Sequence, residues 1–329
     1  MIAKKELNQL LKNNFKLVAF DVDGTLITSD HIVTPRTLRA IKKAKDLGMK
    51  VTIATGRHYP SAIRLARKIQ INAPLICCDG AFIRDIYSND SIYHFLPREM
   101  AVDILRMTQS YENFSVQIFI KKGKIYSGQS YRGSYFIKSL RAPVKRTLKG
   151  YMNFLRDFVF IPVQNTGNIE GAIAALNESP VKIVVYGNER PEDLQDFIDR
   201  ILARYGDKIT VTSSIKNSID ILNGGISKAK GLSILAEKLG IRPDEIITIG
   251  DNFNDLEMLK YAGLGVAMGN APEQVKNKAD YVTDTNNHEG VAKFLEKLIS
   301  VKIKQECVQY DRQNHIAVKR EQNGISLDV

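Results

Sequence analysis

Cysteine is scarce in this chain, with only three among 329 residues. Cys77 and Cys78 are adjacent within an apolar run, and Cys307 lies far from both. An odd number of cysteines without zinc-type spacing indicates neither a disulfide framework nor a zinc site. We therefore interpret the adjacent pair as small buried side chains and expect a protein of the reducing cytosol.

Long apolar runs are also missing. No uninterrupted apolar stretch approaches the length of a membrane span, so we expect no membrane partner. Residues 1–15 form an N-terminal extension that lacks the apolar centre of a signal peptide, and most of it is typical of a short amphipathic helix. Residues 301–329 are polar and aperiodic, and we expect them to be a poorly ordered tail.

Positive charge, in contrast, is plentiful. The chain has 47 Lys+Arg against 36 Asp+Glu, a formal net charge of +11, which favours anionic substrates or partners in general. Residues 129–157 are basic with interleaved aromatics, a pattern found in surfaces that bind RNA or other polyanions. A solvated pair of helices with an aromatic inner face explains the same pattern, and we favour that interpretation.

Apolar runs alternate with amphipathic segments in two parts of the chain. The first part has predicted strands at 17–20, 50–54 and 74–78 with helices between them, and the second runs from a helix at 227–239 to a helix at 289–299. This alternation predicts an α/β fold with a mainly parallel, Rossmann-like sheet. Between the two parts, closely spaced strands and helices predict an inserted α+β domain. We place the core at 16–84 and 224–300, and the insert at 85–223.

Acidic residues follow the first predicted strand. Asp21 and Asp23 lie one residue apart, so an extended chain would direct both side chains to one ligand. One carboxylate can attack phosphorus while the other protonates the leaving oxygen and then activates water. Gly24 allows the sharp turn that exposes backbone N–H groups. A simple surface turn is the alternative interpretation of the Asp-Gly pair.

Three further segments fit the same reaction. Thr55 and Gly56 follow the second strand and offer a hydroxyl and N–H groups for phosphoryl oxygens. Lys228 begins a predicted helix and can neutralise phosphate and nucleophile. The segment 250–255, Gly-Asp-Asn-Phe-Asn-Asp, follows another strand and offers the oxygen ligands that Mg²⁺ prefers. Alternatively, Asp251 could be only a helix cap and Asp255 only an acidic residue of the first helical turn.

Together these four motifs resemble those of the haloacid dehalogenase (HAD) superfamily of phosphohydrolases, over about residues 15–299. Their order, with an α/β cap between the second and third motifs, is similar to the Cof-type branch. The resemblance implies a Mg²⁺-dependent phosphatase that works through an aspartyl-phosphate intermediate. It departs from the family pattern at Ala229, where glycine often follows the motif lysine, which makes Lys230 a minor rival of Lys228.

The resemblance also implies a role for each motif residue. Asp21 would be the nucleophile and a metal ligand, and Asp23 the general acid/base whose backbone carbonyl also binds metal. Lys228 would steady the phosphate and the nucleophile. The phosphate would be bound by the loop residues Val22 and Gly24, by Thr55 and Gly56, and by Asn254. The metal would be bound by Asp251, with Asp255 supporting the metal site.

Three other polar residues lie beside the motifs. We interpret Asp79 as a turn residue, and we assign no role to His31 or His58, because loop histidines are more often solvated than catalytic. The expected substrate is a small phosphorylated metabolite, with sugar phosphates as the leading candidate. Nucleotide, flavin or pyridoxal phosphates and a phosphomutase reaction remain alternatives, nucleic-acid binding ranks low, and the oligomeric state stays open.

Overall fold

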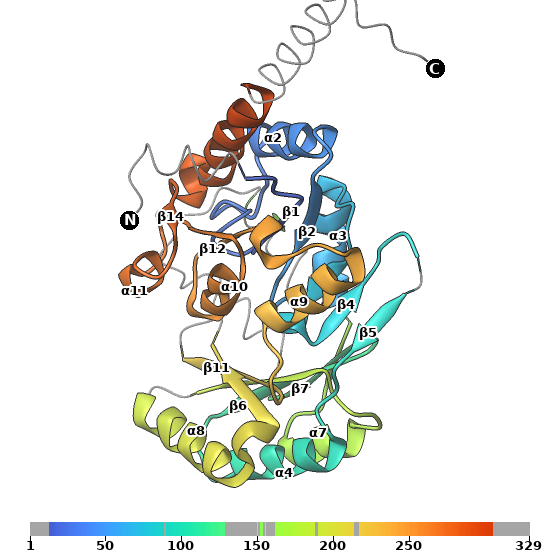
Figure 1. Cartoon of the computed structure of the whole chain (residues 1–329). Helices are drawn as coiled ribbons and strands as arrows, with labels where there is room; N and C mark the ends of the chain where they lie inside the picture. Colours follow the sequence, from blue (N-terminus) through green and yellow to red (C-terminus); the bar gives the residue numbers. More distant parts are fainter. Residues whose placement is uncertain are drawn as a thin grey trace, which may run out of the picture.

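The computed structural model describes residues 13–88, 90–128, 150, 152–153, 155, 162–187, 190–213 and 217–304. The N-terminal extension as far as residue 12, the tail from residue 305 and most of the basic segment 129–157 lie outside this description. Within the described ranges, no helix is both long and apolar enough to cross a membrane. The chain forms a core around one sheet and a cap around a second sheet (Figure 1).

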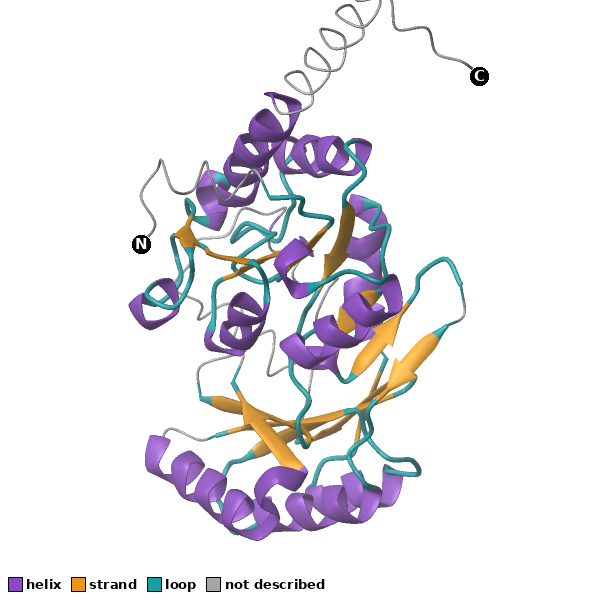
Figure 2. Ribbon diagram, viewed as in Figure 1, coloured by secondary structure: helices purple, strands orange, loops and turns teal. Residues whose placement is uncertain are grey.

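The core sheet has five parallel strands in the order β14-β13-β12-β1-β2. Its strands are β1 (Leu17–Phe20), β2 (Lys50–Ile53), β12 (Ile246–Gly250), β13 (Leu264–Ala267) and β14 (Tyr281–Val282). The inner strands are continuous apolar runs because helices cover both faces of the sheet (Figure 2). The predicted parallel α/β core is confirmed.

Alternate residues of β1 belong to different hydrophobic clusters. Val18 and Phe20 pack on the face covered by α2, α3 and the helical residues 290–304, whereas Leu17 and Ala19 pack on the face covered by α9 and α10. The core helices are α2 (Pro35–Asp46), α3 (Tyr59–Ile69), α9 (Lys228–Leu239), α10 (Leu256–Tyr261) and α11 (Glu273–Lys276). Short 3₁₀ turns are η1 (Cys78–Gly80), η4 (Pro243–Glu245), η5 (Phe253–Asp255) and η6 (Asn286–His288).

The third predicted strand departs from the simple parallel pattern. It forms β3 (Leu75–Cys77), which touches the core sheet through one parallel bridge and pairs antiparallel with β4 (Phe82–Arg84), itself paired with β5 (Ser91–Tyr93). The chain reverses after β3 because Cys78, Asp79 and Gly80 all have positive φ, at 50°, 52° and 98°. Such consecutive left-handed residues give no signal in hydrophobic periodicity, which is why the sequence pattern missed the reversal.

The cap has a six-stranded sheet in the order β10-β11-β9-β6-β7-β8, antiparallel except for the pair β7–β8. Its strands are β6 (Ser115–Ile120), β7 (Gly123–Ser127), β8 (Val163–Asn165), β9 (Lys182–Tyr186), β10 (Ile209–Thr212) and β11 (Ser218–Asn223). Its helices are α4 (Arg98–Thr108), α7 (Ile169–Ala175) and α8 (Pro191–Tyr205), with the 3₁₀ turn η3 (Gly206–Lys208).

The three cap helices cover one face of this sheet, and the opposite face lies toward the core (Figure 1). The predicted α+β insert is therefore present between the second and third motifs. We propose the boundaries 16–84 with 224–300 for the core and 85–223 for the cap.

Gly80 provides a stability test of the reversal after β3. A Cβ atom at this position would lie 2.1 Å from the backbone carbonyl oxygen of Ser227, the N-cap residue of α9. We expect Gly80→Ala to lower the free energy of unfolding by about 3 kcal/mol or more, from left-handed strain and overpacking together.

Gly48→Ala is the matched control, because Gly48 also has positive φ but nothing lies within 4 Å of its added Cβ. It should cost about 1–2 kcal/mol, from the strained φ alone. Urea denaturation followed by circular dichroism measures both variants. Equal losses in the two would show that the close approach of Gly80 to α9 does not matter.

Candidate active site

The ends of three parallel strands meet at one edge of the core sheet. Asp21 directly follows β1, Thr55 lies just beyond β2, and Asp251 directly follows β12. The last residue of β1 is in register with the last residue of β2 and with the penultimate residue of β12. The predicted clustering of the motifs at the carboxyl edge of the sheet is therefore observed.

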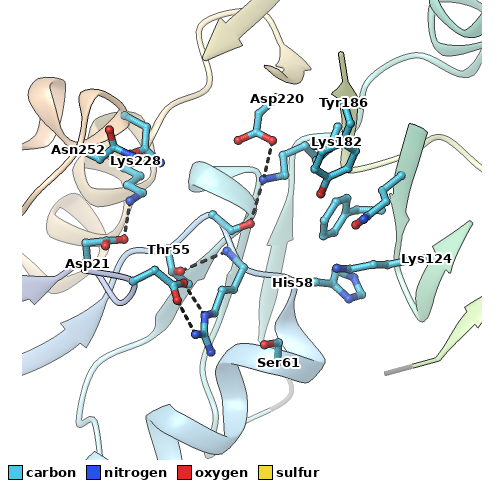
Figure 3. A pocket seen from close by; sticks show the side chains of 17 residues that line it. Asp21, Thr55, His58, Ser61, Lys124, Lys182, Tyr186, Asp220, Lys228 and Asn252 are labelled. Atoms are coloured by element: carbon cyan, nitrogen blue, oxygen red, sulfur yellow. Dashed lines mark hydrogen bonds and ion pairs between the residues drawn. The ribbon is translucent and has the colours of Figure 1, made fainter. Parts of the chain in front are cut away.

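A lysine at the start of α9 links two of these segments. The Lys228 Nζ atom lies 2.6 Å from Asp21 Oδ1 (Figure 3). It also lies 2.6 Å from Asp255 Oδ1, and all three residues are buried. Ser227 caps the helix by accepting a hydrogen bond from its backbone, which sets Lys228 as the first helical residue. Lys230, the rival candidate, is exposed.

Burial and charge oppose each other in this cluster. Burial alone would lower the pKa of Lys228, but the carboxylates of Asp21 and Asp255 outweigh it and raise that pKa above its usual range. Burial raises the pKa of Asp21 well above its usual value even though Lys228 acts in the other direction. The cluster thus holds more negative charge than one lysine can neutralise.

The turn after β1 holds a third carboxylate, that of Asp251, in place. Thr25 Oγ1 donates a hydrogen bond of 2.7 Å to Asp251 Oδ1. Gly24 has φ of +85°, and a Cβ atom there would come within 2.3 Å of Asp251 Oδ2, so only glycine permits this approach. Burial, followed by the charge of Asp255, raises the pKa of Asp251 to about 7.

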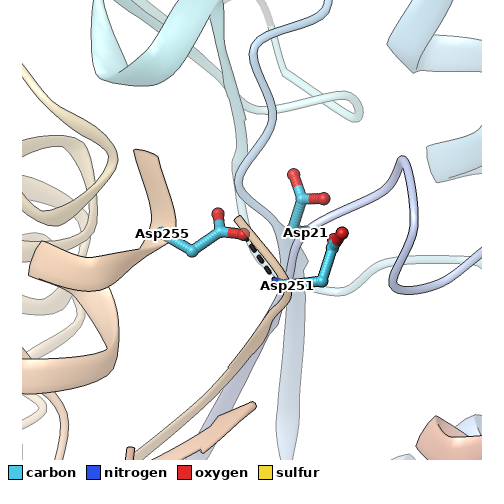
Figure 4. Close-up of side chains that lie close together, drawn as sticks. All are labelled: Asp21, Asp251 and Asp255. Carbon is cyan, nitrogen blue, oxygen red and sulfur yellow. Dashed lines mark hydrogen bonds between the residues drawn. The ribbon is translucent and has the colours of Figure 1, made fainter. Parts of the chain in front are cut away.

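These carboxylates could hold a cation. Oxygens of Asp21, Asp251 and Asp255 lie within 4.8 Å of one another (Figure 4). Asp255 uses Oδ1 for Lys228, and its Oδ2 accepts hydrogen bonds from the backbone N–H groups of Asp251 and Asn252, at 2.8 and 2.9 Å. Asp21 and Asp251 are therefore better placed than Asp255 to bind an ion directly, and carboxylate oxygens suit a hard divalent cation.

Asp255 also serves as a helix cap, because its side chain accepts from the N-cap residue Asn252. Asp255 is the first-turn acid that the alternative interpretation expects, whereas the N-cap is Asn252 rather than Asp251. That interpretation does not account for the bond to Lys228, which joins the cap to the cluster.

The second aspartate of the first motif pairs with arginine. Arg57 Nε and Nη2 donate to the two oxygens of Asp23, each at 2.6 Å. Arg57 is buried, whereas the Asp23 side chain is 46% exposed. Desolvation works to raise the pKa of Asp23, but the charge and hydrogen bonds of Arg57 outweigh it and lower that pKa. Arg57 was not among the predicted site residues, although it follows Thr-Gly in the second motif.

The predicted phosphate-binding residues fall into two groups. Thr55, Gly56 and Asn254 line the same pocket as Asp21 and Lys228.

Val22 and Gly24, by contrast, do not line that pocket. The Val22 side chain is fully buried in the core, and its carbonyl oxygen accepts hydrogen bonds that shape the turn after β1. Val22 and Gly24 thus shape the turn after β1 and do not face the pocket.

The structure adds to the predictions about two polar residues near the motifs. Asp79 lies in a turn, as predicted, but it is also only 1% exposed and bridges the core to the cap. It accepts hydrogen bonds from Lys182 Nζ at 2.9 Å and from Asn254 Nδ2 at 3.0 Å. His58 is not a solvated loop residue: its Nε2 lies 2.9 Å from the Ile120 carbonyl oxygen, and burial lowers its pKa to about 3.

Lys182 of β9 is the cap residue that completes this bridge. Its Nζ atom also donates to the Gly56 carbonyl oxygen at 2.9 Å and lies 3.5 Å from Asp220 Oδ1 of β11. Burial alone would lower the pKa of Lys182, but the two aspartates raise it above its usual range. No sequence pattern indicated this role for Lys182 or Asp220, because their interaction with Asp79 joins two strands of the cap to a turn of the core.

Core and cap enclose a pocket of about 220 Å³ (Figure 3). The core contributes Asp21, Asp23, Thr55, Gly56, Arg57, His58, Ser61, Lys228, Asn252 and Asn254. The cap contributes Gln117, Phe119, Lys124, Lys182, Val184, Tyr186 and Asp220. The Asp21 carboxylate and three cations paired with carboxylates thus line a space between the core and the cap sheet.

The bridge between core and cap is testable by stability. Lys182→Met leaves Asp79 buried without its cation, and we expect the free energy of unfolding to fall by about 3–5 kcal/mol. The exposed Lys230→Met is the control and should change it by less than about 0.5 kcal/mol. Chemical denaturation measures both, and equal effects would show that the bridge contributes nothing to stability.

Comparisons with known proteins agree with this geometry. Residues 18–295 match the model of the haloacid dehalogenase-like hydrolases. The 5-amino-6-(5-phospho-D-ribitylamino)uracil phosphatase YcsE of Bacillus subtilis is 30% identical over 86% of this chain and 95% of its own length. The pyridoxal phosphate phosphatase YbhA of Escherichia coli is 26% identical over 85% of this chain and 97% of its own length.

A solved structure of a haloacid dehalogenase-like hydrolase from B. subtilis superposes with a TM-score of 0.75 at 27% identity, covering 86% of this chain and 99% of the other. A second, from Bacteroides thetaiotaomicron, has a TM-score of 0.70 at 26% identity and covers 86% and 99%. The resemblance expected from the four motifs is confirmed, and the chain belongs to the haloacid dehalogenase-like hydrolase family.

Proposed function

We propose that this protein is a Mg²⁺-dependent phosphatase of small phosphorylated metabolites that works through an aspartyl-phosphate on Asp21. The observation that carries the proposal is the buried Asp21 carboxylate, which is held by Lys228, lies beside Asp251 and lines the pocket between core and cap. The relatives named as phosphatases of pyridoxal phosphate and of a ribitylaminouracil phosphate support a small phosphate ester as substrate.

The first half-reaction forms a bond between an Asp21 oxygen and phosphorus and breaks the ester P–O bond. Asp23, protonated, gives its proton to the departing alcohol oxygen. Lys228, Thr55 and Asn254 line the same pocket and would hold the phosphoryl oxygens as negative charge develops on them. A Mg²⁺ ion bound by Asp21, Asp251 and the Asp23 carbonyl, with Asp255 in support, would offset the repulsion between nucleophile and phosphate.

In the second half-reaction, a water oxygen attacks phosphorus and its proton passes to the Asp23 carboxylate. The bond between phosphorus and Asp21 breaks, which releases inorganic phosphate and restores the nucleophile. Both halves need Asp23 to change protonation state. Its ion pair with Arg57 favours the ionised form, and the negative charge of an incoming phosphate acts in the opposite direction.

Within this class we rank sugar phosphates first, as the sequence suggested. Flavin, nucleotide and pyridoxal phosphates are the second candidate group, and the name of the E. coli relative favours pyridoxal phosphate among them. A phosphomutase would use the same nucleophile and would return the phosphoryl group to an organic product. The polyanion-binding alternative concerns residues 129–157, most of which lie outside the described part of the chain.

Asp21→Asn tests the nucleophile. We expect hydrolysis of the best substrate in a panel of sugar, nucleotide, flavin and pyridoxal phosphates to fall by about a thousandfold or more, because asparagine cannot form the phosphoenzyme. Released phosphate is measured with and without Mg²⁺. The exposed Asp46→Asn is the control and should keep wild-type rates. An Asp21→Asn enzyme that turns over at the wild-type rate would remove the mechanism.

Thermal unfolding tests the metal site independently of turnover. Saturating Mg²⁺ should raise Tm by several degrees, equivalent to about 1–3 kcal/mol, because the ion binds only the folded acidic cluster. Asp251→Asn should abolish this shift. Asp244 is exposed and lies just before β12, the strand that leads to Asp251, so Asp244→Asn should leave the Tm shift unchanged. The same shift in both variants would place the ion elsewhere.

A further inference from the structure

We propose that Lys124 forms an anion-binding subsite in the cap, which selects phosphate esters whose leaving group carries a second anionic group, a carboxylate or another phosphate. The proposal rests on the proposed function, since it concerns the substrate of the same pocket. Its starting point is the pairing of charges around that pocket.

Four cationic side chains line the pocket, and three of them have carboxylate partners. Lys228 pairs with Asp21 and Asp255, Arg57 with Asp23, and Lys182 with Asp79 and Asp220. These contacts range from 2.6 to 3.5 Å. Among the described residues, no carboxylate lies within 4.0 Å of the fourth cation, Lys124. Its position therefore differs from that of every other basic group in the pocket.

Lys124 is nevertheless only 7% exposed. It lies on β7 directly across from Phe119 of β6, and its Nζ atom is 4.2 Å from the centroid of the Phe119 ring. A ring face offsets part of the cost of desolvating an ammonium group but does not replace a counter-ion. Lys124 covers that ring face, so the ring is less suited to stacking a flat aromatic substrate.

The surroundings of Lys124 are more cationic than anionic. Lys182 and Arg57 act on it as like charges, and Asp220 and the Cys78 thiol act in the opposite sense. His58, the remaining titratable group nearby, is buried and its pKa of about 3 keeps it neutral. Burial, reinforced by Lys182, lowers the pKa of Lys124 to about 7. An anion bound at Nζ would stabilise the charged form.

The subsite also lies where a leaving group would extend. The reacting phosphate belongs beside Asp21, Thr55 and Lys228 on the core side of the pocket. Figure 3 shows Lys124 on the opposite side, beyond His58 and close to the cap residues that close the space. A substrate held at both ends would span the pocket from the nucleophile to Lys124.

Matched substrate pairs test the proposal by equilibrium binding. Asp21→Asn protein leaves the esters intact, so calorimetry can compare 6-phosphogluconate with glucose 6-phosphate, and fructose 1,6-bisphosphate with fructose 6-phosphate. The doubly anionic member of at least one pair should bind about ten- to a hundredfold more tightly, the range expected for a charged hydrogen bond. The first pair reports a carboxylate and the second a phosphate.

Adding Lys124→Met should remove this preference while changing the affinity for the singly phosphorylated sugar by less than about threefold. Lys122→Met is the matched control, because Lys122 is exposed in the turn before β7 and should leave the preference unchanged. The preference should also shrink as pH rises above about 7, where Lys124 loses its proton, and this trend should vanish in Lys124→Met.

Equal affinity for both members of each pair, or a preference that survives Lys124→Met, would overturn the subsite. Turnover is a separate measurement. If wild-type protein binds the doubly anionic sugars selectively but hydrolyses none of the panel, the proposed function fails and the subsite stands. If it hydrolyses singly and doubly anionic esters with equal kcat/KM and equal affinity, the subsite fails and the function stands.

Discussion

The site depends on the two salt bridges that Lys228 makes with Asp21 and Asp255. Two carboxylates and one ammonium group are buried together, and each loses most of its hydration. The arrangement is tolerable only because every contact is short and Asp255 also accepts two backbone N–H groups. These two salt bridges join the end of β1, the start of α9 and the turn before α10, so the fold of the core fixes the position of Asp21, the proposed nucleophile.

The burial of several carboxylates beside a single lysine also explains why a divalent cation would fit at this cluster. One lysine cannot balance Asp21, Asp251 and Asp255, and burial raises the pKa of both Asp21 and Asp251. A positive ion between Asp21 and Asp251 would remove that imbalance without moving a strand. The residual negative charge would favour the binding of a metal ion, and without such an ion it would repel the phosphate that the site is proposed to attack.

Local signals in the sequence were enough to predict most of the core. Acidic residues after short apolar strands, a threonine after another strand and a capped lysine each gave a pattern that a single segment carries. Among the residues whose significance was missed, Asp79 and Lys182 pair with each other across more than a hundred positions, and Lys124 has no carboxylate partner in the described part of the chain. Their significance comes from how cap strands lie over the core, and no segment of sequence records that placement.

Alternation within the cap strands nevertheless held a partial clue. In β6, β9 and β11 the residues facing α4, α7 and α8 are aliphatic, and the positions that alternate with them carry Gln117, Lys182 and Asp220 besides the apolar Phe119, Val184 and Leu222. Polar residues at alternate positions of a strand usually mark a solvated face. Here that face is turned to the core, so its charges must be paired or serve a ligand. Lys182 and Asp220 are paired with each other, and Lys182 also pairs with Asp79. Lys124 has no such pairing among the described residues, so we propose that it serves a ligand. Among the described cationic residues of the pocket, Lys124 is then the one whose charge no carboxylate within 4.0 Å offsets, and on our proposal it helps to distinguish one phosphate ester from another.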